Sequence, residues 1–231
     1  MLTLDKLRLE QGTFRLAADL TVATGARVAV IGPSGAGKST LLAAIAGFLA
    51  PVSGRILWDG QDITATPPGT RPLSILFQDQ NLFPHLSVAQ NIGLGLDPRL
   101  RLTPADQARI DAALDRTGLA GLGPRKPAEL SGGQQSRVAL ARTLLRARPL
   151  LLLDEPFSAL GPALKAEMLA LTAEISAEQG TTLLMVTHDP QDAAALCPQT
   201  LLVAEGAAQP PQDTRTLLAD PPPSLRAYLG A

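Results

Sequence analysis

Eight consecutive residues combine glycines, a lysine and a hydroxyl group at a spacing that suits phosphate. The segment reads Gly32-Pro33-Ser34-Gly35-Ala36-Gly37-Lys38-Ser39, and Thr40 follows it. Glycines let backbone N–H groups approach phosphate oxygens without a Cβ in the way. Lys38 would supply a positive charge to the β and γ phosphates, and the Ser39 hydroxyl is placed for Mg²⁺. The segment therefore predicts a phosphate-binding loop.

The flanking elements give this loop the context that it needs. Residues 27–31 form a short apolar run that predicts a buried strand of a parallel sheet. Residues 40–46 predict a helix, which Gly47 ends. A helix N-terminus after the loop adds free N–H donors and the positive end of a dipole.

Two adjacent carboxylates follow a second predicted strand. Residues 150–153 are four leucines, and Asp154 and Glu155 come directly after them. Ligands bind at the carboxyl ends of the strands in an open parallel sheet. Asp154 can hold Mg²⁺, and Glu155 can orient and deprotonate an attacking water.

A second anion-binding nest is predicted at Ser131-Gly132-Gly133-Gln134, where a helix over residues 135–148 would begin. One nucleotide does not need two nests within one chain. A natural solution is a head-to-tail dimer, in which the nest of one subunit closes on the γ-phosphate held by the other.

The remaining patterns predict a mixed α/β fold. Apolar runs at 74–77 and 182–187 predict further parallel strands, and stripes at helical spacing after Thr103 and over 164–175 predict helices. Strands that alternate with helices place helices on both faces of the sheet. Asp59-Gly60 predicts a hairpin turn within 54–64.

Composition narrows the function classes. The chain has 231 residues, 45% of them hydrophobic, with a net charge of −1, so it is neither a disordered chain nor one with a strongly basic surface for nucleic acid. Its single cysteine forms no internal disulfide. The first residues do not predict a secretory signal, and the apolar runs are shorter than the ~20 residues of a spanning helix. We expect any span to come from a partner.

These motifs occur in the order found in ATP-binding subunits of ABC transporters, which the chain resembles over nearly its whole length. The first motif is the phosphate loop, which extends to Thr40, and the second is Gln78, which follows the apolar residues 76–77. The others are the helix-start segment 130–134, the strand with its acidic pair at 150–155, and His188 in the segment 186–189. The resemblance implies a P-loop NTPase core with a mostly parallel sheet and a small antiparallel β element. It also implies an α-helical lobe. We expect a single domain over 1–231, with the core at 1–78 and 141–231 and the lobe at 79–140.

The same resemblance implies ATP and Mg²⁺ as the bound groups. ATP would be contacted by Gly32, Pro33, Ser34, Gly35, Ala36, Gly37, Lys38, Ser39 and Thr40, and from across a dimer by Ser131, Gly132, Gly133 and Gln134. Mg²⁺ would be held by Ser39, Gln78 and Asp154. Glu155, His188 and Gln78 would be the catalytic residues.

Two positions depart from the family pattern. The family usually has an aspartate after Ser-Ala-Leu, whereas Gly161 follows 158–160 here, which puts one contact across the dimer in doubt. The family also commonly stacks an aromatic residue on adenine, and Gln11 aligns with that position. Phe14 is nearby, and it either takes the place of that aromatic residue or belongs to the hydrophobic core.

Several stretches are similar to the ATPases of thiamine importers, namely 47–51, 66–72, 76–98 and 154–160. The resemblance implies an ATPase subunit that couples hydrolysis to uptake of thiamine, with its phosphates as further candidate substrates. The subunit would be a peripheral protein at the cytoplasmic face of the inner membrane. Its expected partners are a second copy, membrane permease subunits and, indirectly, a periplasmic or extracellular substrate-binding protein.

Three alternatives stay open. One is the ATPase of another small-molecule or ion importer. Another is a soluble ABC-type ATPase acting on nucleic acid or ribosomes, although a single cassette, a net charge of −1 and the absence of heptads speak against it. We therefore expect no nucleic-acid partner. The third is a small-molecule kinase, but that function would not account for the second anion-binding nest or for Gln78.

Overall fold

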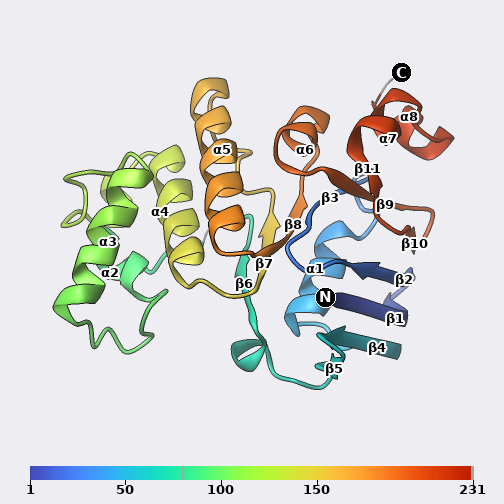
Figure 1. Cartoon of the computed structure of the whole chain (residues 1–231), viewed down its shortest axis with the longest axis horizontal. Coiled ribbons are helices and arrows are strands. Elements are labelled where there is room, and N and C mark those ends of the chain that lie inside the picture. Colours follow the sequence, from blue (N-terminus) through green and yellow to red (C-terminus); the bar gives the residue numbers. More distant parts are fainter. Residues whose placement is uncertain (80, 230–231) are drawn as a thin grey trace.

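A computed structural model describes residues 1–79 and 81–229 of the chain. Its described strands form one sheet in the order β5-β4-β1-β2-β10-β9-β3-β8-β7-β6, and β11 pairs with β9 (Figure 1). Five strands run parallel to one another: β6 (Leu73–Leu76), β7 (Leu150–Asp154), β8 (Thr182–Val186), β3 (Arg27–Ile31) and β9 (Gln199–Ala204).

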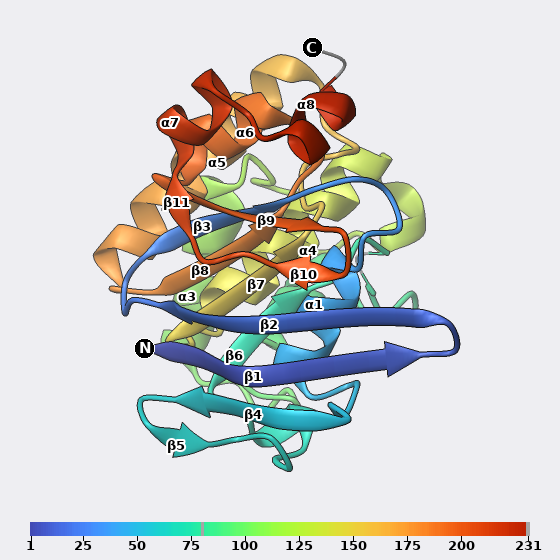
Figure 2. The same ribbon diagram turned by 90° about the vertical axis from the view of Figure 1, so that its right-hand side faces the viewer.

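An antiparallel part lies beside these strands (Figure 2). It contains β1 (Leu2–Gln11), β2 (Phe14–Val22), β4 (Ser53–Trp58) and β5 (Gln61–Asp62). The short strand β10 (Ala207–Ala208) pairs with both β2 and β9 and so joins the two parts. Strand β11 (Gln212–Asp213) pairs with the beginning of β9, on the edge of β9 that faces away from β3.

Successive side chains of a parallel strand point to opposite faces of the sheet, and both faces are buried here, which explains why these strands are apolar throughout. In β3, Val28 and Val30 face one hydrophobic cluster, while Ala29 and Ile31 face another. Both clusters are buried, so neither face of the strand can carry polar side chains. Helix α1 (Lys38–Ala46) fills the first cluster, between the parallel strands and the β1–β2 hairpin.

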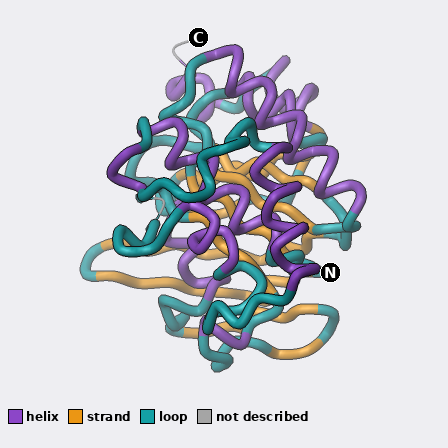
Figure 3. The backbone as a smooth tube through the Cα atoms, turned by 90° about the vertical axis from the view of Figure 1, so that its left-hand side faces the viewer, coloured by secondary structure: helices purple, strands orange, loops and turns teal. Residues whose placement is uncertain are grey.

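The second cluster is covered by α5 (Pro162–Glu178), α6 (Pro190–Leu196) and, towards the C-terminus, α7 (Thr214–Ala219) and α8 (Pro223–Leu229). A third cluster holds α2 (Val88–Gly93), α3 (Pro104–Arg116) and α4 (Gly132–Leu145) together. Figure 3 shows these helices in front of the strands. Two 3₁₀ turns, η1 (Pro68–Thr70) and η2 (Pro127–Glu129), complete the fold.

Helix α4 belongs to two clusters at once. Val138 and Ala141 pack with α2 and α3, whereas Ala139, Leu140 and Leu144 pack against the parallel sheet. The helix is continuous across residue 140, the predicted end of the helical lobe.

The predicted α/β architecture is confirmed, and the individual elements agree closely. Strands predicted at 27–31, 74–77, 150–153 and 182–187 are β3, β6, β7 and β8. The hairpin forms at Asp59 and Gly60, both with positive φ as a tight turn requires. The antiparallel element is larger than predicted, because β1 and β2 belong to it. No helix in residues 1–79 or 81–229 has the length and apolarity to span a bilayer.

Candidate nucleotide-binding site

The phosphate loop joins β3 to α1, and its backbone leaves room for glycine alone at two positions. A Cβ on Gly32 would lie 1.9 Å from the carbonyl oxygen of Val203, and φ there is 151°. Gly37 is the N-cap of α1 with φ 100°, and its Cβ would lie 2.3 Å from Cζ of Phe14. Larger residues would push the loop away from the sheet.

Lys38 lies folded across its own loop. Its Nζ donates hydrogen bonds to the carbonyl oxygens of Gly32 at 2.8 Å and Pro33 at 2.9 Å. The residue is only 9% exposed. Burial lowers the pKa of Lys38, while the carboxylates of Glu155 and Asp154 act in the opposite direction. The ammonium is thus held beside the N-terminus of α1, where a phosphate would need it.

Asp154 ends β7 and meets the first turn of α1. The Ser39 hydroxyl donates a hydrogen bond of 3.0 Å to Oδ1 of Asp154. Burial raises the pKa of Asp154, which the bond from Ser39 opposes and the nearby Glu155 reinforces. A nearby cation would stabilise the charged form of this partly buried carboxylate and so offset the free-energy cost of its desolvation.

These oxygens fit Mg²⁺, which prefers hard oxygen ligands and usually keeps waters and substrate phosphates in its shell. The part of the chain that the structure describes has no cluster of three or more His, Cys, Asp or Glu suited to a metal. A metal here would therefore depend on Ser39, Asp154 and the oxygens of the nucleotide.

Glu155 turns away from β7 because its backbone is left-handed, with φ 48°. Its N–H donates to the carbonyl of Val186 at the end of β8, at 3.1 Å. This turn brings Oε2 of Glu155 to 3.4 Å from Nδ1 of the exposed His188. Two of the three predicted catalytic residues, Glu155 and His188, therefore lie together.

Gln78 follows β6 at the same edge of the sheet. It is exposed and lines a cavity of about 240 Å³ together with Glu155 and Ser136. The structure thus places Gln78 near the predicted base, on the side from which α4 approaches.

Ser131, Gly132, Gly133 and Gln134 form a cap at the start of α4. Ser131 Oγ accepts from the Gln134 N–H at 3.3 Å, and Gln134 Oε1 accepts from the Ser131 N–H at 2.9 Å. Ser131 and Gly132 are exposed. Helices α4 and α1 pack on opposite faces of the parallel sheet, so this cap and the phosphate loop belong to helices on different sides of the sheet.

The two departures from the family pattern have clear positions. Gly161 is the N-cap of α5 with ordinary extended angles, φ −68° and ψ 159°, and it provides no side-chain cap. Gln11 is exposed at the end of β1, opposite Phe14. The aromatic residue beside the phosphate loop is Phe14, whose ring also packs against the core cluster.

One group beside the site was missed by sequence reasoning. Lys165 in α5 forms ion pairs with Asp189 and Asp192, which flank the start of α6. The available signal was Asp189-Pro190, a cap residue followed by proline, directly after His188.

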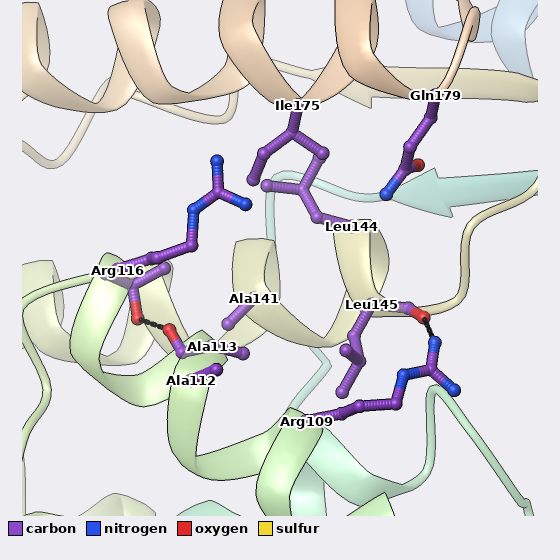
Figure 4. Close-up of a pocket in the computed structure, with 10 residues that line it drawn as sticks. Arg109, Ala112, Ala113, Arg116, Ala141, Leu144, Leu145, Ile175 and Gln179 are labelled. Carbon is purple, nitrogen blue, oxygen red and sulfur yellow. Dashed lines mark hydrogen bonds between the residues drawn. The ribbon is translucent and has the colours of Figure 1, made fainter.

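A cavity of about 250 Å³ lies away from these residues, between α3, α4 and α5 (Figure 4). Leu144 and Ile175 line its apolar part, and Arg109 and Arg116 lie at its edge. Arg116 pairs with Glu174 at 2.9 Å and Glu178 at 3.4 Å, which links α3 to α5 across exposed surface.

Comparison with known proteins decides the family. A family model described as ABC transporter matches residues 17–158. The chain belongs to the ABC transporter family. This ABC cassette is 66% identical, over the full length of both chains, to a protein of Cereibacter sphaeroides named thiamine import ATP-binding protein ThiQ. It is 50% identical to a protein of the same name from Mesorhizobium japonicum, over 99% of this chain and 90% of the relative.

Solved structures share the fold of the cassette. A dimeric bacterial ABC transporter cassette, MJ0796, superposes with a TM-score of 0.83 at 28% identity, covering 93% of this chain and 99% of that one. A second structure of that protein is a dimer in a post-hydrolysis state with ADP and phosphate, with a TM-score of 0.82. The structure of cbiO1 from Clostridium perfringens, part of the ABC transporter complex cbiONQ, gives a TM-score of 0.81 at 30% identity, covering 95% of this chain and 90% of that one.

Proposed function

We propose that this cassette is the ATP-hydrolysing subunit of a thiamine importer. The observation that carries the ATPase assignment is the convergence of Lys38, the Ser39–Asp154 bond and the Glu155–His188 pair on one edge of the sheet. The thiamine assignment is supported by full-length similarity, at 66% identity, to a protein named for thiamine import.

In this proposal the phosphate loop and Lys38 bind the triphosphate of ATP, and Ser39 and Asp154 hold Mg²⁺ with Gln78. Mg²⁺ would neutralise phosphate charge when bound. Glu155 would accept a proton from the attacking water, and His188 would hold Glu155 in register. The left-handed turn at Glu155 supports this role, because it brings the carboxylate to His188.

Two copies would bind two ATP molecules at their interface. The cap at Ser131 supports this arrangement, since it is an exposed helix N-terminus whose helix packs on the face of the sheet opposite to α1. The relative MJ0796 is described as a dimer. Closure of two cassettes on γ-phosphate would be a rigid-body motion of the kind known for nucleotide switches.

An exposed aromatic surface beside Gln78 supports a permease partner. Phe48 is 58% exposed and packs edge-on against Phe77 with 5.3 Å between ring centroids. Val52 and Phe83 are also largely exposed. Exposed apolar patches mark interaction sites. The proposed helical lobe, 79–140, would transmit closure to permease subunits at the cytoplasmic face of the inner membrane, with a substrate-binding protein on the far side.

The decisive experiment replaces Glu155 with glutamine. Glu155→Gln should bind ATP but release phosphate roughly 100-fold more slowly or worse, since the general base is lost. The variant should accumulate as an ATP-bound dimer in size-exclusion chromatography. Glu167→Gln, an exposed residue in α5, is the control and should hydrolyse ATP normally. A monomeric, fully active Glu155→Gln would refute the assignment.

A transport assay tests the substrate. Cells that lack the cassette should lose uptake of labelled thiamine, and the wild-type chain, but not Glu155→Gln, should restore it. Intact uptake in its absence would remove thiamine as the substrate while leaving the ATPase assignment in place.

A further inference from the structure

A partly buried ionic cluster lies next to Glu155 and His188. Lys165 Nζ donates to Oδ2 of Asp189 at 2.7 Å and lies 3.0 Å from Oδ1 of Asp192. The side chains of Lys165 and Asp192 are 22% and 10% exposed. Bonding to Asp189 raises the pKa of Lys165, so the ammonium stays charged.

The position of Lys165 is unfavourable for its own helix. It lies in the first turn of α5, and its N–H donates to Gly161, the N-cap. A cation at this end opposes the helix dipole and costs about 0.3–1 kcal/mol. The first turn has no acidic residue to compensate, so the carboxylates that offset this cost come from another segment.

That segment is the turn that carries His188. Thr187 Oγ1 accepts from the Asp189 N–H at 3.1 Å and donates to Oδ2 of Asp192 at 3.4 Å. Asp189 also caps α6 through the Gln191 N–H at 2.9 Å. The residues on both sides of His188 are therefore tied to the cluster that Lys165 neutralises.

Lys165, Thr187, His188 and Glu155 line one small cavity of about 50 Å³. Lys165 forms its ion pairs with the two aspartates, whereas Glu155 pairs with His188. Without the ammonium, two carboxylates would face one another in a poorly solvated place, and repulsion would displace the turn.

We propose that Lys165 is a positioning residue, which holds the 187–189 turn so that His188 stays against Glu155. This role rests on the proposed ATPase function and adds α5, the helix that follows Gly161, to the parts that control hydrolysis. A movement of α5 would shift Lys165, and through its ion pairs Lys165 would displace the turn that carries His188.

The test compares steady-state ATP hydrolysis of Lys165→Gln, Lys165→Arg and wild type. Lys165→Gln should lower kcat roughly 10- to 100-fold with KM for ATP changed less than about threefold, since small misplacements of catalytic groups have costs of that size. Lys165→Arg keeps the charge and should recover most of kcat. In a His188→Ala background, Lys165→Gln should lower kcat no further, because its effect passes through that histidine.

Arg116→Gln is the matched control, because Arg116 also pairs with two carboxylates and its partners lie on α5. It should leave kcat unchanged. Equal kcat for Lys165→Gln and wild type, or an undiminished effect without His188, would overturn the inference. If Lys165→Gln does not fold, Asp189→Asn removes the carboxylate of the shorter ion pair, which ties the turn itself to Lys165, while its amide oxygen can still cap α6. It should give a fall in kcat, and a normal kcat would overturn the inference. If Glu155→Gln loses ATP hydrolysis while Lys165→Gln keeps it, the inference about Lys165 fails and the proposed ATPase function stands.

Discussion

The Ser39 hydroxyl donates a hydrogen bond to Asp154 at 3.0 Å although 115 positions separate the two residues. Ser39 lies in the first turn of α1, and Asp154 is the last residue of β7. The bond therefore joins two motifs that the sequence shows only as separate segments. It also places hydroxyl and carboxylate oxygens where a phosphate-bound Mg²⁺ would lie.

Asp154→Asn should stabilise the protein in the absence of nucleotide. The raised pKa of Asp154 means that ionising it costs more in the folded chain than in the unfolded one. Stability therefore falls as pH rises from the ordinary carboxyl pKa through the raised one. At pH 7 asparagine should raise Tm, by about 2–4 °C for each kcal/mol recovered.

The difference in Tm between Asp154→Asn and wild type should shrink as pH falls towards 4, where the carboxyl group takes up its proton. Scanning calorimetry across this range measures it. The rate of Mg²⁺-dependent ATP hydrolysis should fall in the same variant. A lower Tm at pH 7 would contradict the prediction.

Lys38→Met should weaken ATP binding. Hydrogen bonds from a charged group contribute about 1.5–3 kcal/mol, which corresponds to roughly a tenfold to hundredfold loss of affinity. Titration of a fluorescent ATP analogue measures the dissociation constant. Lys126→Met is the control, because Lys126 likewise donates to a backbone carbonyl, that of His85, outside the phosphate loop. Equal affinities for both variants would show that Lys38 does not contact phosphate.

Gly161→Asp should stabilise α5. Gly161 has extended angles, and an added Cβ would meet no atom within 4 Å. An aspartate there can accept from the free N–H groups of the first turn, for a gain of a few tenths of a kcal/mol over glycine. Denaturation in urea should show a higher midpoint with an unchanged slope. Gly161→Asn provides the cap without the charge and should give a similar gain; a lower midpoint for both would mean the loop requires glycine.

Phe48→Ala should separate ATP hydrolysis from permease binding. The Phe48 ring is mostly exposed and adjoins Phe77, so its loss leaves the core intact. The isolated cassette should keep its rate of phosphate release, while co-purification with permease subunits should fall. Glu167→Gln, at an exposed position in α5, is the control and should co-purify with permease subunits as the wild type does. Undiminished co-purification would place the permease surface elsewhere.

Sequence patterns predicted the parallel core well because its strands are buried on both faces and read as continuous apolar runs. The β1–β2 hairpin escaped prediction for a physical reason. Leu2 and Leu4 are buried in register, but the pairing shifts before Leu7 and Leu9, where Lys6 adopts a left-handed φ of 48°. This irregularity breaks the two-residue period on which recognition of a strand depends.

The site was predicted to the extent that its residues occur in contiguous motifs. The contacts of Lys165 were not foreseeable in this way, because they join α5 to a turn beyond β8 through folding alone. The position of Phe14 against Gly37 likewise depends on how the hairpin packs on α1.

The outward-facing cap at Ser131 makes damaged copies able to complement one another. If each ATP lies between the Lys38 of one copy and the Ser131 of another, a chain lacking Lys38 and a chain lacking Ser131 would each be inactive alone. Mixed together, the pair would concentrate both defects in one half of the assembly and leave the other half whole.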